Sequence, residues 1–260
     1  MIFYLIIFLL ITNLILIFTI NKNKIKKLIY KSKIKSVNLE KLDSVFINNR
    51  IDKNLYGPKH DAIVKNFCIV PGNNIVGMTS DYEAWIISSL SKKSDNIFEF
   101  GTCSGKTTFL MALNSPKNAN ITTLTLGPKN LSELKLSKLD NKVSFRNIVN
   151  ESIYEKFLFS DTEYENKINV LFENSLNFDE NKHVGAFDLI FIDGGHTYSI
   201  VKNDSEKSFR MLRQNGIILW HDFVPGKESA KNVVKYINSI SKDKKIFHIK
   251  NTSLCYYRNN

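Results

Sequence analysis

Four residues that can bind a cation or transfer a proton follow two apolar segments of the chain. The segment "FDLIFID" ends at Asp193 and is followed three residues later by His196, and the segment "GIILW" is followed directly by His221 and Asp222. Continuous apolar runs of this length are typical of buried parallel strands, and the carboxyl ends of neighbouring parallel strands open on the same edge of a sheet. We therefore expect the four side chains around one crevice, where carboxylates and imidazoles suit a divalent cation.

A glycine-rich turn follows another apolar segment, "NIFEF". Glu99 lies near the end of that segment, and the turn runs from Gly101 to Gly105 before a helical stretch begins. An acidic residue, a Gly-x-x-x-Gly turn and a helix are typical of a doubly wound fold that binds an adenosine-bearing ligand. The glycines let the backbone approach the ligand, and Glu99 can accept hydrogen bonds from an ammonium group. These features favour S-adenosylmethionine, which carries an amino acid and a sulfonium but no phosphate.

The same turn can also be compared with a phosphate-binding loop, because Gly105 is followed by Lys106 and Thr107. A Walker A loop has four residues between its first glycine and the Gly-Lys pair, whereas this turn has only Thr102, Cys103 and Ser104. A loop one residue shorter cannot surround a phosphate with the same ring of backbone amides. The segment "LIFID" nevertheless resembles a strand that ends in a magnesium-binding aspartate, so a P-loop phosphotransferase remains an alternative.

The alternation of strands and helices predicts an α/β sheet with crossover connections. Ser80 and Glu83 have the spacing of a capping box and open the first helix of this part. We expect strands at 96–100, 121–126, 169–173, 187–193 and 216–220, and helices at 81–90, 106–113, 197–212 and 229–240. A hairpin over 245–249 and 253–257 closes the chain, and the polar stretch 127–167 is expected to be partly helical.

The first 20 residues are apolar except for Thr12, Asn13 and Thr19. About 20 such residues cross the hydrocarbon core of a bilayer. A signal peptide would have a basic region before the apolar run and small residues after it, and neither is present. We therefore predict a transmembrane anchor at 1–20 and a single-pass membrane protein whose catalytic domain is cytoplasmic, because basic flanks stay on that side.

The formal charge of +11 is concentrated near the start of the chain. The first 35 residues hold seven lysines and no acid, so only four of the excess charges belong to the rest. An AT-rich codon bias explains the abundance of lysine over arginine, and we expect no nucleic-acid partner. We assign a basic flank and tether to 21–75 and the catalytic domain to 76–260. Three cysteines without metal-binding spacing are expected to be reduced thiols.

Three stretches together resemble class I S-adenosylmethionine-dependent methyltransferases: "FEFGTCSGKTTFLMAL", "FDLIFIDGGHTYSIVKNDSEKSFRMLRQNGIILWHDF" and "IFHIKNTSLCYYR". The chain is most similar to the branch of small-molecule and sugar O-methyltransferases that includes macrolide-sugar methyltransferases and cephalosporin-hydroxylase-like proteins. The similarity covers roughly 76–258. It implies a Rossmann-like, doubly wound, mostly parallel sheet of seven strands with the last strand antiparallel, and a cofactor at the carboxyl ends of the first strands.

The resemblance also implies which residues bind the cofactor. They are Glu99, Gly101, Thr102, Gly105, Thr125, Asn174 and Ser175. Thr125 stands where the family usually has an acid for the ribose hydroxyls, and Asn174 replaces an acid near the adenine. A threonine lacks the charge-assisted hydrogen bonds of a carboxylate. A non-catalytic binding or scaffold protein with a methyltransferase fold is therefore a further alternative.

Some relatives hold Mg²⁺ with two carboxylates at these strand ends and use the histidine three residues after the first as a base. Carried across, Asp193 and His196 form the catalytic pair, and Asp193 and Asp222 bind the metal. His221 departs from the acid often found there and could ligate or orient. The predicted function is a membrane-anchored O-methyltransferase that acts on a hydroxyl of a sugar or similar small polar acceptor. A glycan or lipid-linked acceptor would suit the anchor.

Overall fold

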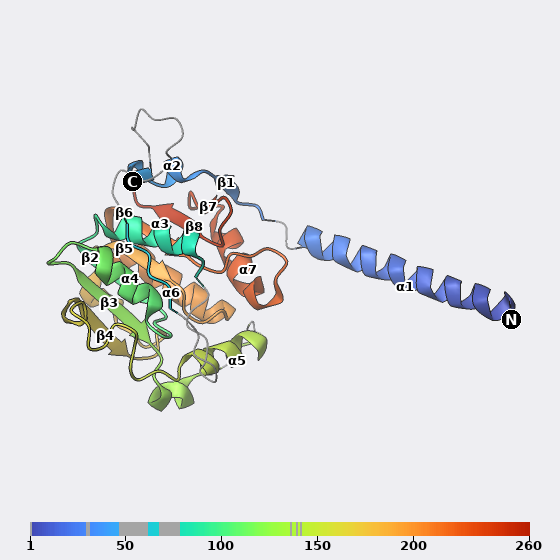
Figure 1. The fold of residues 1–260 in the computed structure, drawn as a ribbon, viewed down its shortest axis with the longest axis horizontal. Helices are drawn as coiled ribbons and strands as arrows, with labels where there is room; N and C mark the ends of the chain where they lie inside the picture. Colours follow the sequence, from blue (N-terminus) through green and yellow to red (C-terminus); the bar gives the residue numbers. More distant parts are fainter. Residues whose placement is uncertain are drawn as a thin grey trace.

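A mixed sheet of eight strands forms the centre of the protein (Figure 1), in the order β1-β7-β8-β6-β5-β2-β3-β4. Neighbouring strands are parallel except at β8, which is antiparallel to both β6 and β7. The computed structural model describes residues 2–29, 32–46, 62–67, 79–135, 137–138, 140 and 142–260.

The strands are β1 (Lys35–Val37), β2 (Asn96–Phe100), β3 (Asn120–Thr125), β4 (Ile168–Phe172), β5 (Phe187–Ile192), β6 (Leu212–Trp220), β7 (Phe247–Ile249) and β8 (Cys255–Arg258). The α-helices are α1 (Ile2–Ile29), α2 (Leu39–Leu42), α3 (Asp81–Ser91), α4 (Lys106–Asn114), α5 (Lys142–Glu151), α6 (Tyr198–Met211) and α7 (Lys231–Ile240). Short 3-10 helices lie at Ser44–Phe46, Pro128–Glu133, Glu165–Lys167, Glu180–His183 and Glu228–Ala230.

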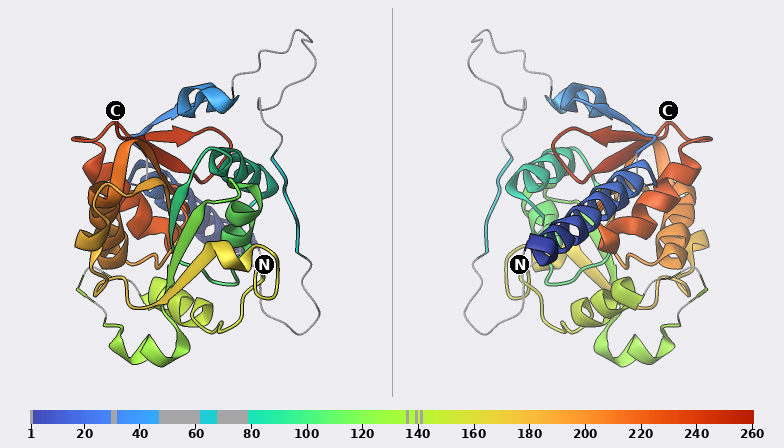
Figure 2. Two further views of the ribbon diagram at one scale, coloured as in Figure 1. Left: turned by 90° about the vertical axis from the view of Figure 1, so that its left-hand side faces the viewer. Right: turned by 90° about the vertical axis from the view of Figure 1, so that its right-hand side faces the viewer.

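Successive residues of the central strands point to opposite faces of the sheet, and both faces are apolar. Phe98, Ile190 and Ile218 pack in one buried cluster with residues of α6 and α7. Ile97 and Phe191 pack in a second cluster with residues of α3 and α4. Figure 2 shows the two pairs of helices on either side of the strands. A parallel strand that is covered on both faces needs the continuous apolar run seen in the sequence.

Most predicted elements are confirmed, as is the doubly wound topology with an antiparallel last strand. The predicted count of seven strands is wrong, because β1 adds an eighth by pairing in parallel with β7. The sequence of β1 is Lys-Ser-Val, too short and too polar to give an apolar strand signal. Much of the predicted tether at 21–75, and one of the three cysteines, Cys68, lie outside the described residues.

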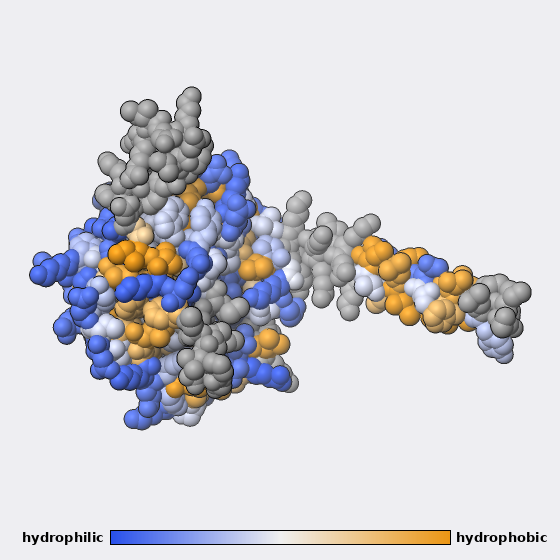
Figure 3. Space-filling model, viewed as in Figure 1, coloured by the Kyte–Doolittle hydropathy of each residue, from blue (hydrophilic) through white to orange (hydrophobic). Residues whose placement is uncertain are grey.

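The N-terminal stretch forms the long helix α1, which extends away from the sheet (Figure 1) and carries exposed apolar side chains such as Leu14 and Phe18 (Figure 3). Within the residues that the structure describes, no helix combines the length and the apolar character that a membrane span requires. Polar residues interrupt the apolar run of α1 at Thr12, Asn13 and Thr19. The prediction of a transmembrane anchor and of a single-pass membrane location is therefore wrong.

Candidate functional site

The carboxyl ends of β2, β5 and β6 are joined beyond the last residue of each strand. The backbone N–H of Asp193 donates to the carbonyl oxygen of Phe100 over 2.9 Å, and the N–H of His221 donates to that of Ile192 over 3.0 Å. These bonds carry the parallel pairing into the segments that follow the strands. They place Asp193 and His221 at one edge of the sheet, as the strand order requires.

The turn after β2 can be made only by glycine at its first position. Gly101 has a φ of +96°, and a Cβ there would lie 2.3 Å from the carbonyl oxygen of Asp193. Gly105, at the N-terminus of α4, has a φ of +81°, and a Cβ there would lie 2.7 Å from the ring of Phe159. Only glycine adopts these angles without strain, so Gly101 lets the turn lie against the end of β5 and Gly105 lets it lie against Phe159.

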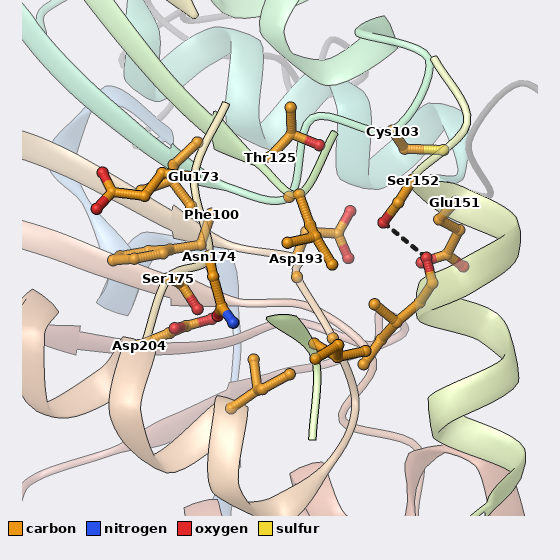
Figure 4. A pocket seen from close by; sticks show the side chains of 18 residues that line it. Phe100, Cys103, Thr125, Glu151, Ser152, Glu173, Asn174, Ser175, Asp193 and Asp204 are labelled. Atoms are coloured by element: carbon orange, nitrogen blue, oxygen red, sulfur yellow. Dashed lines mark hydrogen bonds between the residues drawn. The ribbon is translucent and has the colours of Figure 1, made fainter. Parts of the chain in front are cut away.

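A pocket of about 550 Å³, which includes its open mouth, lies at this edge of the sheet (Figure 4). Its lining is drawn from the ends of β2, β3, β4 and β5, from α5 and from α6. The predicted residues that line it are Gly101, Thr125, Asn174, Ser175 and Asp193. In the close-up, Asn174 and Ser175 lie at one end of the pocket and Glu151 and Cys103 at the other, with Asp193 between them.

Three further predicted cofactor residues are outside the pocket lining: Glu99 lies beneath the turn, and Thr102 and Gly105 belong to the turn itself. The carboxylate of Glu99 is fully buried and accepts hydrogen bonds from the hydroxyls of Thr108 and Thr123. The hydroxyl of Thr102 lies 2.6 Å from that of Thr123. Burial, together with the charge of Asp193, raises the pKa of Glu99 to about 8. Glu99 and its two threonine partners support the turn from below.

The four residues with which the sequence analysis began do come together. His196 Nε2 lies 2.9 Å from Asp222 Oδ2, and His221 Nδ1 lies 2.9 Å from Asp193 Oδ1 and 3.1 Å from Asp222 Oδ2. Ligand atoms of Asp193, His196 and Asp222 all lie within 4.8 Å of one another, which a single cation could bridge. His196 Nδ1 is buried and has no hydrogen-bond partner among the described residues.

The two carboxylates control the protonation of the two imidazoles. Burial alone would lower the pKa of His196, but Asp222 and Asp193 outweigh it and raise that pKa above its ordinary value. Burial also opposes the protonated form of His221, but the neighbouring carboxylates, Asp193 above all, raise its pKa well above the ordinary value. Burial opposes the ionised form of Asp222, yet its bonds to the two histidines lower its pKa. The cluster therefore favours two carboxylates with protonated or strongly hydrogen-bonded imidazoles.

Two acids near this cluster were not predicted as site residues. Glu83 of α3 has its Oε2 atom 3.6 Å from His221 Nε2, an electrostatic contact longer than a hydrogen bond. Glu151, the last residue of α5, lines the pocket with an exposed side chain, and partial desolvation at the pocket wall together with the charges of Asp193 and Asp222 raises its pKa. The capping-box pattern revealed Glu83 only as a helix cap, and the polar stretch that contains α5 gave no signal for a pocket residue.

The lysine of the suspected phosphate loop is engaged elsewhere. Lys106 Nζ donates to the backbone carbonyl of Thr79 over 3.0 Å, and Lys106 is not part of the pocket lining. Thr107 is buried, with its hydroxyl 3.4 Å from that of Thr79. Both residues act as first-turn residues of α4, as the adenosine-binding interpretation expects.

Residues 98–223 match the family model described as a methyltransferase domain. Two solved structures share the fold with a TM-score of 0.50 and 17% sequence identity. One is an SAH-bound methyltransferase from Podospora anserina, covering 70% of this chain and 80% of that one. The other is a predicted caffeoyl-CoA O-methyltransferase from Staphylococcus aureus, covering 70% of this chain and 85% of that one. No curated protein matches the sequence.

Proposed function

We propose that this chain, of which residues 98–223 match a methyltransferase domain, is an S-adenosylmethionine-dependent enzyme that methylates a hydroxyl oxygen of a small polar acceptor such as a sugar. The observation that carries this proposal is the position of the carboxylate–imidazole cluster beside the pocket. Asp193 belongs to both, because it lines the pocket and lies 2.9 Å from His221. A methyl donor in the pocket would thus meet the acceptor at Asp193.

The pocket has the features that a sulfonium donor requires. The turn at Gly101 exposes backbone at the pocket wall, and the negative charge of Asp193 at the same wall favours a cationic donor. Asn174 and Ser175 supply polar groups at the other end, where the adenosine part would lie. Apolar side chains such as Leu124 also line the pocket.

His196 is the residue that we assign as general base. If its Nε2–H donates to Asp222, the neutral imidazole keeps its lone pair on Nδ1, which is buried and unpartnered among the described residues. That nitrogen can take the proton of the acceptor hydroxyl. The acceptor oxygen then attacks the methyl carbon, the carbon–sulfur bond breaks, and its electron pair remains on sulfur as S-adenosylhomocysteine forms. No covalent enzyme intermediate is required.

A divalent cation fits the same cluster. Asp193 and Asp222 present two carboxylates close enough to share one ion, and carboxylate oxygens suit Mg²⁺. We propose that these two residues would hold it, and a bound ion would lower the pKa of the acceptor hydroxyl. His221 lies within hydrogen-bond distance of both carboxylates, so it orients them whether or not an ion is present.

The proposal is tested with the full-length protein by calorimetry with S-adenosylmethionine and by methyl transfer to a panel of sugars and other hydroxyl acceptors. We expect His196→Gln to lower kcat by about 10² to 10⁴, because that is the usual contribution of a general base. Binding of S-adenosylmethionine should change little, because His196 is not among the residues that line the pocket. Addition of EDTA should lower the wild-type rate, and Mg²⁺ should restore it.

Lys106→Ala is the matched control, since this residue lies outside both the pocket and the cluster. It should leave donor binding and transfer unchanged, whereas a P-loop phosphotransferase would lose ATP binding. Absence of S-adenosylmethionine binding by the wild-type protein would refute the proposal. Binding without transfer to any hydroxyl acceptor would instead support a non-catalytic binding protein.

A further inference from the structure

The two ring nitrogens of His221 face different groups. Nδ1 lies 2.9 Å from Asp193 Oδ1 and 3.1 Å from Asp222 Oδ2, whereas Nε2 is buried and has no hydrogen-bond partner among the described residues. His221 is 7% exposed, so water has little access to that nitrogen. A buried polar atom without a partner is costly, and the orientation of this ring therefore requires an explanation.

A fixed negative charge lies on the Nε2 side of the ring. Oε2 of Glu83 is 3.6 Å from Nε2, and Glu83 is 5% exposed. Four donors hold this carboxylate in place: the N–H and the hydroxyl of Ser80 bond to Oε2, and those of Ser253 bond to Oε1. Because all four bonds come from groups other than His221, the position of the charge does not depend on the histidine.

This charge distinguishes between the two orientations of the imidazole ring. A rotation of 180° about the bond from Cβ to the ring would replace each nitrogen by a carbon, so that Asp193 and Asp222 would face C–H groups. In the observed orientation, Nδ1 donates to these carboxylates, which can only accept when ionised. Nε2, when it carries a hydrogen, is attracted by the charge of Glu83.

The orientation of His221 affects the assigned general base through Asp222. Oδ2 of Asp222 lies 3.1 Å from His221 Nδ1 and 2.9 Å from His196 Nε2, so one oxygen contacts both imidazoles. We propose that Glu83 is a positioning residue of the methyl-transfer reaction. It fixes the ring of His221, which holds Asp222 in the place where Asp222 orients His196. This inference rests on the proposed function and extends the functional site to α3.

The test uses Glu83→Gln in the full-length protein. Glutamine has nearly the same size but carries no charge, so it no longer favours one orientation of the His221 ring. Outer partners of functional side chains typically contribute about 10- to 100-fold to activity, and we expect kcat to fall by about this factor. Binding of S-adenosylmethionine, measured by calorimetry, should change little, because Glu83 and His221 are outside the pocket lining.

The double variant Ser80→Ala, Ser253→Ala is the matched control. It removes both hydroxyl donors to Glu83 and should lower stability, as Glu83→Gln does. The two backbone N–H groups still hold the carboxylate opposite His221 Nε2. This variant should therefore keep kcat close to the wild-type value, which separates positioning from a loss of stability.

A second measurement does not depend on activity. The protein has five histidines, and after labelling of their ring nitrogens with ¹⁵N the signals of His221 are identified by their absence in His221→Gln. A buried ring in one orientation should give an Nδ1 proton that exchanges slowly with water, both in the wild type and in the serine double variant. Glu83→Gln should lose this slow exchange, because the ring can then reorient.

Three results would overturn the inference. In the first, Glu83→Gln folds and keeps the wild-type kcat. In the second, the serine double variant lowers kcat by the same factor as Glu83→Gln, so that the effect is only structural. In the third, the Nδ1 proton of His221 exchanges rapidly in the wild type; this result needs no variant and stands even if Glu83→Gln fails to fold.

Failure of the proposed function has a different signature. A wild-type protein that binds no S-adenosylmethionine would refute the proposed function, and with it any role of Glu83 in methyl transfer. The ring signals would still decide whether Glu83 fixes the orientation of His221.

Discussion

At the scale of single residues, Glu99 beneath the glycine turn makes the stability of the protein depend on pH. Its carboxylate is buried beneath the pocket and is held by Thr108 and Thr123. Burial is the largest cause that raises its pKa, from 4.5 to about 8. The folded state therefore binds the Glu99 proton more tightly than the unfolded state does. Its contribution to stability is complete below about pH 4.5 and is lost as the pH rises toward 8.

We predict that Glu99→Gln makes the protein more stable relative to wild type as the pH increases from 5 to 9. The glutamine carbonyl can still accept from Thr108 and Thr123, but it never has to ionise in the buried site. Thermal unfolding across this pH range measures the difference. Glu133→Gln, which removes the charge of an exposed acid, is the control. A difference for Glu99→Gln that stays constant from pH 5 to 9 would contradict the prediction.

The strand-end residues could be predicted from the sequence because their positions follow from local rules. Asp193 and His221 lie directly after buried apolar strands, and the ends of parallel strands share one edge. The positions of Asp204 and Glu151 in the pocket lining could not be predicted in this way. Each lies on a helix whose rotation about its axis decides whether the side chain faces the pocket, and that rotation depends on packing against the sheet.

At the scale of elements, the residues that cap the N-terminus of α3 also contact the functional site. Its capping box is complete: Ser80 accepts from the Glu83 N–H, and the Glu83 side chain accepts from the Ser80 N–H. The other carboxylate oxygen of Glu83 accepts from the backbone and hydroxyl of Ser253, over 2.6 and 2.8 Å. One side chain thus joins α3 to the hairpin of β7 and β8 and faces His221.

We predict that Glu83→Ala destabilises the protein more than Ser80→Ala does. Loss of the Ser80 cap costs about 1 kcal/mol. Loss of Glu83 additionally leaves the N–H of Ser253 without its acceptor, which costs about 1–3 kcal/mol more. Urea unfolding measures both values, and Asp81→Ala, in the same first turn, is the control. Equal effects of Ser80→Ala and Glu83→Ala would show that Glu83 acts only as a cap.

The elements themselves were predictable where apolar patterns are strong. The expected strand at 96–100 coincides with β2, and that at 216–220 forms the second half of β6. α5 was not located because it lies in a polar stretch in which charged residues hide its apolar stripe. β1 has only three residues and belongs to the sheet only because β7 provides a free edge.

At the scale of the whole molecule, the folded unit begins at the segment that precedes β1. Ile34, Val37 and Leu42 are buried in the two clusters that cover the sheet. Asp43, also buried, forms ion pairs with Lys93 and Arg258. By contrast, the described side chains of α1 are exposed along its length. The sequence predicted a tether here, but part of this segment adds a strand to the sheet and packs against it.

This boundary predicts a sharp difference between two truncations. Deletion of residues 1–29 should leave the free energy of unfolding nearly unchanged, because α1 contributes no buried side chain among those described. Deletion of residues 1–46 should lower it by several kcal/mol, since burial of each large apolar side chain contributes about 1.5–3 kcal/mol. It also leaves Lys93 and Arg258 without Asp43. Urea unfolding of both proteins gives the two values.

If the longer deletion does not fold, Phe46→Ala in the full chain decides the question, with an expected loss of about 3–5 kcal/mol. Equal destabilisation by the two deletions would mean that α1 belongs to the folded unit.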